Sequence, residues 1–229
     1  SFSYITTDGK ALSGSATVTI NVVVPSAPTT LSALDDFDRP DAASLGTSSV
    51  GATPGNSWTQ LATSAQPAPD VGLVGGKARA NTTTLGGLAV LDQVLLETQG
   101  ASISLATPLG NSALVLKATG GTAVAPANYV RVRCESGSGG EVVVATLMGG
   151  SNVSVFVKQA AFAAAGCDLS SGSLSAVVDD KGLVTTFLNG TFVGGVQLPD
   201  VGAWKGRGKI GLQLQNSTAT VDNFSGGSL

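Results

Sequence analysis

The sequence contains no histidine, and this absence removes a large group of mechanisms. Histidine is the usual general base near neutral pH and the commonest zinc ligand. Catalysis by a Ser–His or Cys–His pair is therefore excluded, and the many serines have no visible group to activate them. The chain has only two cysteines, which are too few to form a thiolate metal site on their own.

Charged and aromatic residues are also scarce, at 12% and 5% of the 229 residues, and the net charge is −3. An acidic chain is repelled by phosphate backbones, so we expect no nucleic acid partner. No apolar run approaches the roughly 20 residues of a spanning helix, so we expect no membrane span. Low charge together with 31 glycines is typical of β-rich extracellular modules. We therefore expect a secreted or cell-surface protein of bacterial type.

The two cysteines, Cys134 and Cys167, fit either one disulfide or two buried thiols. Cys134 follows Val130 and Val132 on the inward face of an expected strand, and Cys167 lies in a Gly-Cys-Asp turn. A bridge would close a loop of roughly 33 residues and contribute about 3–4 kcal/mol in the chain-entropy model. Both alternatives remain open at this point.

Residues 1–24 are predicted to form a β-hairpin that turns at Asp8-Gly9. Its second strand carries an apolar face made of Val18, Ile20, Val22 and Val24. An isolated hairpin is marginally stable in water, so we expect this face to pack on an adjacent domain or on another copy of the protein. Residues 25–33 follow as a proline-containing linker.

Residues 34–229 predict a single all-β domain, an antiparallel jelly-roll β-sandwich. Many short alternating runs separated by glycine-rich turns indicate this architecture, and no segment is long enough to form a crossover helix. Asn189-Gly190 between two alternating runs is the strongest hairpin signal. We expect the first strand at Asp36–Arg39, the last at Thr220–Phe224, one strand at Ala89–Thr98 and a helical turn at Ala160–Ala165.

The order of several motifs resembles the concanavalin A-like lectin/glucanase jelly roll in its laminin-G-like form. These motifs are Asp35-Asp36-Phe37-Asp38-Arg39, Trp58, Tyr129-Val130-Arg131-Val132-Arg133, Val184–Gly190, Trp204-Lys205-Gly206, Lys209-Ile210-Gly211-Leu212 and Asp222-Asn223-Phe224. The resemblance covers residues 34–226 and implies two curved sheets with a concave face. Some members of the family bind sugar there, some hydrolyse it and some only space or assemble surface proteins. Residues 1–24 resemble the last two strands of a cadherin-like or bacterial Ig-like repeat.

The resemblance also implies a calcium ion between the first and last strands. Asp36 and Asp38 from the first strand and Asp222 from the last are the matching candidates, and Gly72–Gly76 could add a carbonyl ligand. Ca²⁺ takes oxygen ligands of this kind, and neighbouring carboxylates repel unless a cation neutralises them. The alternative is that these are solvated acids at strand ends.

Candidate sugar-binding residues are Trp58 and Trp204, because exposed tryptophans form stacking platforms for sugars. Ordinary core packing is the competing interpretation of both. Arg131 and Arg133 lie on one side of their strand, where they could line a cleft or form a solvated face.

Retaining glycosidases need two carboxylates about 5 Å apart. Laminarinase-type members of the resembled family carry them as Glu-x-Asp-x-x-Glu on one strand, and this chain lacks that motif. Its three glutamates, Glu97, Glu135 and Glu141, have no second acid at strand spacing. We therefore predict a non-catalytic extracellular module for adhesion or self-assembly. A carbohydrate-binding module is the alternative, and a glycoside hydrolase is the third interpretation.

Overall fold

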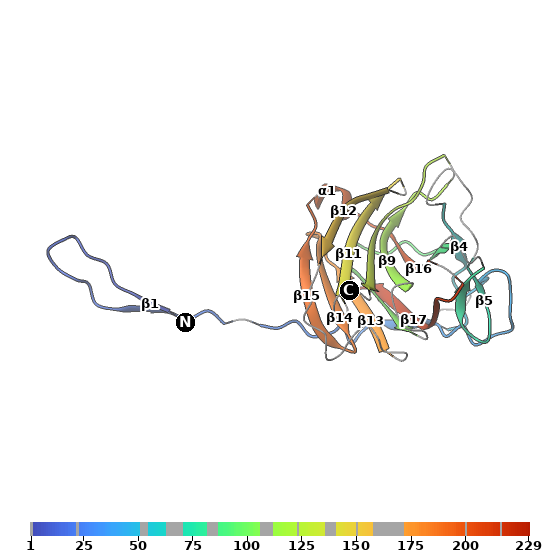
Figure 1. Cartoon of the computed structure of the whole chain (residues 1–229), viewed down its shortest axis with the longest axis horizontal. Helices are drawn as coiled ribbons and strands as arrows, with labels where there is room; N and C mark the ends of the chain where they lie inside the picture. Colours follow the sequence, from blue (N-terminus) through green and yellow to red (C-terminus); the bar gives the residue numbers. More distant parts are fainter. Residues whose placement is uncertain are drawn as a thin grey trace.

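The computed structural model describes residues 2–21, 23–50, 55–62, 71–81, 87–105, 112–122, 124–135, 141–149, 151–157, 172–199, 201–215 and 217–229. Its described regular structure is β apart from one short helix, α1 (Val201–Trp204), which confirms the predicted all-β class (Figure 1). Within these ranges no helix is long and apolar enough to cross a membrane.

Two antiparallel sheets form the sandwich. The first has seven strands in the spatial order β12 (Ser151–Val157), β11 (Glu141–Met148), β10 (Asn128–Glu135), β9 (Ser112–Thr119), β16 (Lys209–Leu214), β7 (Gly87–Leu91) and β4 (Trp58–Gln60). The second has eight: β15 (Thr191–Gln197), β14 (Leu183–Leu188), β13 (Gly172–Val178), β8 (Gln99–Leu105), β17 (Thr220–Ser228), β6 (Ala78–Ala80) and β5 (Val71–Leu73), with β3 (Ser32–Asp35) pairing with β17 beside this path.

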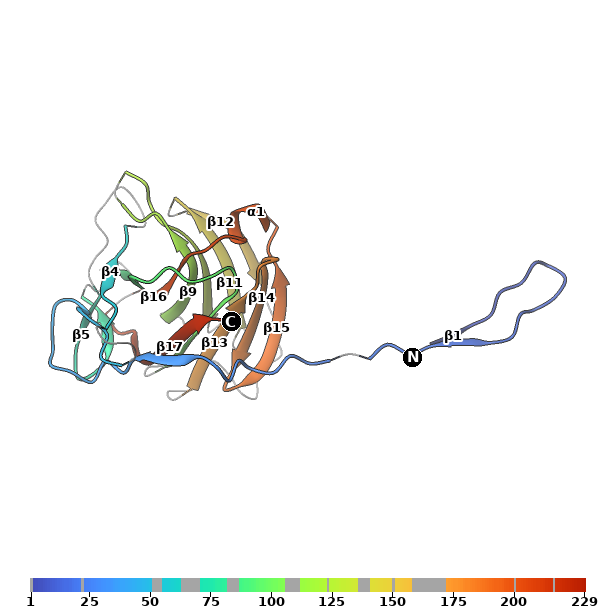
Figure 2. The same ribbon diagram turned by 180° about the vertical axis from the view of Figure 1, so that it is seen from behind.

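The first and last strands of the sandwich lie side by side, as the sequence predicts. In the β3–β17 ladder, Asp35 is opposite Phe224 and Ser32 is opposite Gly226. Figure 2 shows the start of the sandwich in blue running beside the last strand in red. This ladder brings the two ends of the domain together, and the candidate site is built on it.

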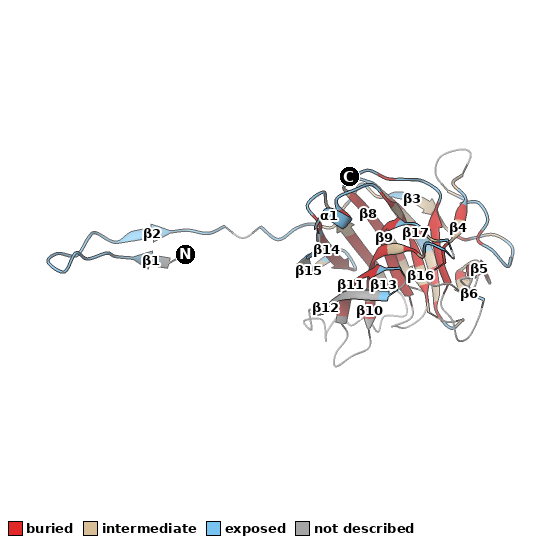
Figure 3. Ribbon diagram, turned by 90° about the horizontal axis from the view of Figure 1, so that it is seen from above, coloured by how far each residue is buried: buried red, intermediate tan, exposed pale blue. Residues whose placement is uncertain are grey.

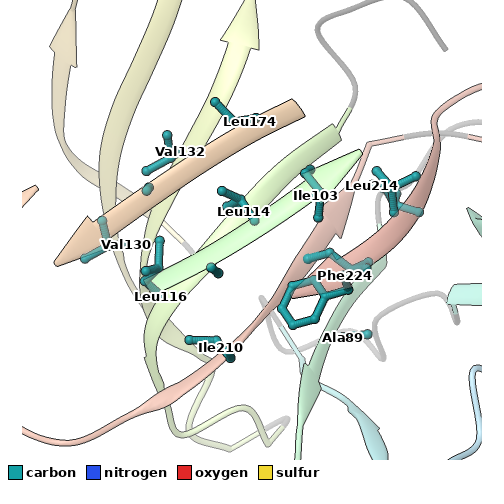
Figure 4. Close-up of a cluster of buried hydrophobic side chains, with 14 of the residues drawn as sticks. Ala89, Ile103, Leu114, Leu116, Val130, Val132, Leu174, Ile210, Leu214 and Phe224 are labelled. Atoms are coloured by element: carbon teal, nitrogen blue, oxygen red, sulfur yellow. The ribbon is translucent and has the colours of Figure 1, made fainter. Parts of the chain in front are cut away.

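The main core lies between the two sheets. Alternate residues of the central strands point into it, including Leu114 and Leu116 of β9, Ile103 of β8 and Phe224 of β17 (Figure 4). Each of these four side chains is fully buried. Burial of this much aliphatic surface supplies the main driving force for folding, at about 25 cal/mol per Å² of apolar area.

A second apolar cluster covers the outer face of the seven-stranded sheet, the face turned away from the eight-stranded sheet. It includes Val90, Val115, Tyr129 and Ala145, all fully buried, and Leu61 from the segment that follows β4. Backbone hydrogen bonds from Ala62 to Gly121 and from Ala127 to Ala62 hold neighbouring loop segments together. The outer face of this sheet is therefore largely apolar, and β9 and β11 read as near-continuous apolar runs. Strands β10 and β16 also place Arg131, Arg133 and Gln213 on that face.

The N-terminal hairpin forms as predicted but is shorter. Strand β1 (Phe2–Tyr4) pairs with β2 (Ala16–Val18), so the strand ends at Val18 and does not continue to Val24. The described side chains of residues 3–26 are exposed, and the hairpin projects away from the sandwich (Figure 3).

Three local predictions need correction or fall outside the description. Residues 36–39 are not a strand, because the chain turns after β3. The expected strand Ala89–Thr98 is divided: β7 ends at Leu91, and the central strand β8 begins at Gln99. The helical turn expected at Ala160–Ala165 lies outside the described residues.

Candidate functional site

A buried carboxylate fixes the chain where β3 ends. Asp35 is 1% exposed and accepts hydrogen bonds from both Arg39 Nη atoms at 2.5 and 3.0 Å and from Trp58 Nε1 at 2.6 Å. The Ser49 hydroxyl and the Phe37 N–H, both at 2.9 Å, complete its shell. A buried carboxylate needs such partners, because isolated charges are very costly to remove from water. The local pattern around Asp35 does not indicate this role, because Trp58 lies 23 residues further along the chain.

Two residues beside this network have positive backbone φ angles, and the chain changes direction at each of them. Phe37 has φ 56°, and Asn223 has φ 49° at a register shift between Asp222 and Phe224. Both are left-handed conformations, which are uncommon for residues other than glycine. They bury the Phe37 and Phe224 rings against Trp58, at centroid distances of 5.9 and 5.2 Å. The neighbouring aspartates are left on the surface side.

Asp36, Asp38 and Asp222 consequently line one pocket of about 350 Å³, which we call the acidic pocket. Its other lining residues are Asn223, Lys77 and the glycines of the β5–β6 turn, Gly75 and Gly76. These glycines have φ 59° and 70°, as a tight hairpin turn with two left-handed residues requires. Gly76 lies next to the Asp38 carboxylate, since a Cβ built on it would be in ordinary contact with Asp38 Oδ1 at 3.5 Å. The structure thus brings together the acids and the glycine turn that the sequence placed far apart.

Local hydrogen bonds orient the acids of this pocket. Asp36 Oδ1 accepts from the Ser49 hydroxyl and from the Asp38 N–H at 3.1 Å. These two bonds hold the pKa of Asp36 below its usual value, the Ser49 bond being the larger cause. Asp222 Oδ1 accepts from the Asn223 N–H at 2.9 Å. Asp36 is therefore ionised at neutral pH, and its carboxylate can accept hydrogen bonds from hydroxyl groups or coordinate a cation.

The residues of the acidic pocket are of the type that binds Ca²⁺, but their carboxylates are not spaced closely enough to form a metal centre. Carboxylate and backbone oxygens are the ligands that Ca²⁺ takes. In the part of the chain that the structure describes, however, no three acidic side chains lie close enough to form a ready-made metal centre. The ammonium group of Lys77, in the same pocket, supplies positive charge as well.

The two tryptophans are not stacking platforms, which corrects that prediction. Trp58 and Trp204 are 8% and 3% exposed and belong to the main core. The physical reason for Trp58 is its indole N–H, whose acceptor is the buried Asp35, while its ring packs between two phenylalanines. Neither ring offers a face to a sugar.

The arginine pair lies on the outer face of the seven-stranded sheet, in the middle of the second apolar cluster. Arg131 is opposite Val115 on β9 and Ala145 on β11, and it is only 7% exposed. The solvated face expected for it is therefore wrong, whereas Arg133 is half-buried. Next to them Tyr129 is fully buried, and this burial raises the pKa of its hydroxyl.

Of the two cysteines, the structure describes only one. Cys134 is disulfide-bonded, which excludes a free thiol there, while Cys167 lies outside the described residues.

The register of β10 and β11 puts Glu135 directly opposite Glu141. The spacing of acidic residues along a single strand does not reveal this pair, because the pair depends on the register of the hairpin.

Comparison with known proteins leaves the fold as the common feature. No family model matches the sequence, and no curated protein is significantly similar to it. A Bacillus subtilis protein of unknown function with a galectin-like fold superposes with a TM-score of 0.50 at 10% identity, covering 75% of this chain and 89% of that one.

Two other solved structures have lower TM-scores. A lichenase, a β-1,3-1,4-glucanase from a mouse hindgut metagenome, gives 0.49 at 10% identity, with 85% and 98% of the two chains covered. A carbohydrate binding module from Bacillus subtilis gives 0.48 at 12% identity, with 75% and 95% covered. At these identities the likeness is one of fold alone, an antiparallel jelly-roll β-sandwich.

Proposed function

We propose that this sandwich is a non-catalytic extracellular carbohydrate-binding module that holds its ligand in the acidic pocket. The observation that supports this most strongly is the lining of the pocket. Three carboxylates, one amide, one ammonium group and bare glycine backbone converge there from three separate segments of the chain. Sugar hydroxyls both donate and accept hydrogen bonds, and those donated to carboxylates are of the stronger, charge-assisted kind.

The size of the pocket supports the same function. Its volume of about 350 Å³ lies at the lower end of the range for small-molecule sites and suits one sugar residue of a longer glycan. Asp36 is oriented before binding, because it accepts hydrogen bonds from the Ser49 hydroxyl and the Asp38 N–H. Preorganisation of this kind reduces the cost of ordering side chains when a ligand binds.

We also propose that Asp36, Asp38 and Asp222 hold a calcium ion, for which their carboxylates must move closer together than they lie in this structure. A bound Ca²⁺ would neutralise the repulsion between the carboxylates and could accept ligand hydroxyls at its remaining coordination positions. Saturating calcium at about 100 times its Kd should then stabilise the fold by roughly 2.7 kcal/mol. Melting temperatures of chelator-treated protein, with and without added Ca²⁺, measure this. An unchanged melting temperature in metal-free protein contradicts calcium binding but leaves direct sugar binding intact.

A glycan array tests the proposed function directly. We expect saturable binding that is lost in the double variant Asp38→Asn/Asp222→Asn and retained in Asp180→Asn, whose exposed acid lies outside the pocket. A hydrolysis screen on β-glucans tests the non-catalytic part. Turnover abolished by Glu135→Gln or Glu141→Gln would make the protein a glycosidase instead.

Adhesion through self-assembly is the second candidate function, and the N-terminal hairpin favours it. Ile20 and Val24 are 64% and 65% exposed, and Tyr4 is 51% exposed. Apolar residues gathered on one projecting ribbon are typical of a surface that another domain or another copy covers. The two functions are compatible, because the hairpin and the acidic pocket lie on different parts of the chain.

A further inference from the structure

A second pocket lies at the other end of the β3–β17 ladder, and we call it the rim pocket. Its volume is about 540 Å³. Ser32 and Leu34 of β3 and Gly226 of β17 line one side, and Asn56 and Gln93, which lie next to β4 and β7 of the other sheet, line the opposite side. Along β17, Gly226 is four residues from Asp222, or roughly 13 Å in an extended strand. The rim pocket is therefore separate from the acidic pocket.

Two glycines of β17, Gly226 and Gly227, line the rim pocket with backbone alone. A Cβ on Gly227 would meet nothing within 4 Å, so the space beside this residue is open. The position of a Cβ on Gly226 is instead filled by the core, because Ile210 Cδ1 lies 2.2 Å from it. The half-buried Leu34 supplies an apolar wall. This combination leaves room for a flat ring with an apolar face.

The polar groups of the rim pocket are uncharged. Asn56 Nδ2 donates to Gln93 Oε1 at 3.0 Å, so each amide orients the other. Whichever way the two amides are flipped, the pair keeps one carbonyl oxygen and one amide NH₂ group for a ligand. Gln93 is exposed and Asn56 half-exposed, so both are accessible. None of the described lining residues is ionisable.

We propose that the rim pocket binds a neutral sugar residue independently of any cation. An acceptor and a donor side by side match a pair of neighbouring hydroxyls, and the leucine wall matches the C–H face of a pyranose ring. A charged sugar is disfavoured, because no opposite charge would compensate for its desolvation. This inference shares with the proposed function only the ligand class, since it uses a different set of residues.

Side-chain amide resonances provide the test. Neutral mono- and disaccharides are titrated into ¹⁵N-labelled full-length protein in chelator, and the NH₂ signals of Asn56 and Gln93 are followed. We expect these two signals to shift in the wild type. In Asn56→Ala/Gln93→Ala, which lacks both reporter groups, affinity is followed through backbone amide signals and should fall roughly tenfold, because about two hydrogen bonds are removed. The isosteric Gln93→Glu should weaken binding as well. Gln197→Ala, which removes an exposed amide on β15, should leave affinity unchanged.

The outcomes separate this inference from the proposed function. If no neutral sugar shifts the two amide signals, or if acidic sugars shift them more strongly, the rim-pocket inference is wrong. Binding that is lost in Asp38→Asn/Asp222→Asn while the amide signals stay fixed supports the acidic pocket alone. Shifted amide signals together with array binding unaffected by the aspartate variants would support the rim pocket and overturn the acidic-pocket proposal.

Discussion

At the scale of single residues, we expect the stability of the fold to depend most strongly on the buried Asp35. Replacing it by alanine removes the acceptor of the Trp58 N–H and the paired charge of the Arg39 guanidinium, which keeps its bond to the Leu45 carbonyl oxygen. Breaking a buried ion pair from one side costs about 3–5 kcal/mol, so we expect a loss of that size in the free energy of unfolding by urea. The exposed Asp180→Ala variant should stay within about 0.5 kcal/mol of the wild type. Equal stabilities of the two variants would refute the role given to Asp35.

The buried Tyr129 makes the stability of the fold depend on pH in the alkaline range. Burial raises the pKa of its hydroxyl in the folded protein above the value of 10.0 for an exposed tyrosine. The unfolded chain therefore loses this proton first, and stability falls as the pH rises through about 10. Tyr129→Phe lacks this proton, so the stability difference between wild type and variant should change above pH 10 and stay constant below it.

Urea denaturation of both proteins at a series of pH values measures that difference. Comparing the two proteins cancels the titration of Lys117, whose pKa is lowered chiefly by burial. A difference that is constant up to pH 11 would show that the Tyr129 hydroxyl reaches solvent.

At the scale of elements, the centre of the seven-stranded sheet leaves no room beside β16. A Cβ on Gly211 would lie 2.0 Å from the carbonyl oxygen of Ala89 on β7, a backbone atom that cannot move alone. We expect Gly211→Ala to cost at least about 1–3 kcal/mol through strand displacement. Gly206→Ala is the matched control, because a Cβ there meets nothing within 4 Å. Similar thermal stabilities for both variants would contradict the close approach of β7 and β16.

The elements that could be predicted from sequence are those with strong local signals. Asn189-Gly190 forms the β14–β15 turn with φ 50° and 76°, as its residue types predict. Strand β8 was missed, because Gln-Gly-Ala-Ser-Ile-Ser-Leu is small and polar although it lies at the centre of its sheet. Its strand character comes from pairing with β13 and β17, which no local pattern records.

The candidate site follows the same rule. Asp36, Asp38 and Asp222 could be named from the family resemblance, and they do share a pocket. Their convergence, however, depends on the bends at Phe37 and Asn223, not on the strand alternation used to predict it. Core packing of Trp58 was one of two interpretations open from the sequence, and it is decided by the hydrogen bond to Asp35, 23 residues earlier in the chain.

At the scale of the whole molecule, the hairpin and the sandwich are expected to be separable. Deleting residues 1–24 should leave the melting temperature of the sandwich unchanged, because the described hairpin side chains are exposed and add nothing to its core. Any self-association should weaken, and light scattering over a concentration series measures this. The full-length variant Ile20→Ser should show the same weakening in smaller degree. Loss of the fold in the truncated protein, or unchanged association, would refute separate roles for hairpin and sandwich.

Isothermal titration of a glycan selected on the array tests the central claim most directly. The titration is made into wild type and into Asp38→Asn/Asp222→Asn, with Asp180→Asn as control, first in chelator and then in calcium. Binding at the acidic pocket predicts the same affinity for wild type and for Asp180→Asn. The double variant should bind at least about tenfold more weakly, since it loses charge-assisted hydrogen bonds to the ligand. The same affinity in all three proteins, under both conditions, would show that the acidic pocket is not where this protein binds carbohydrate.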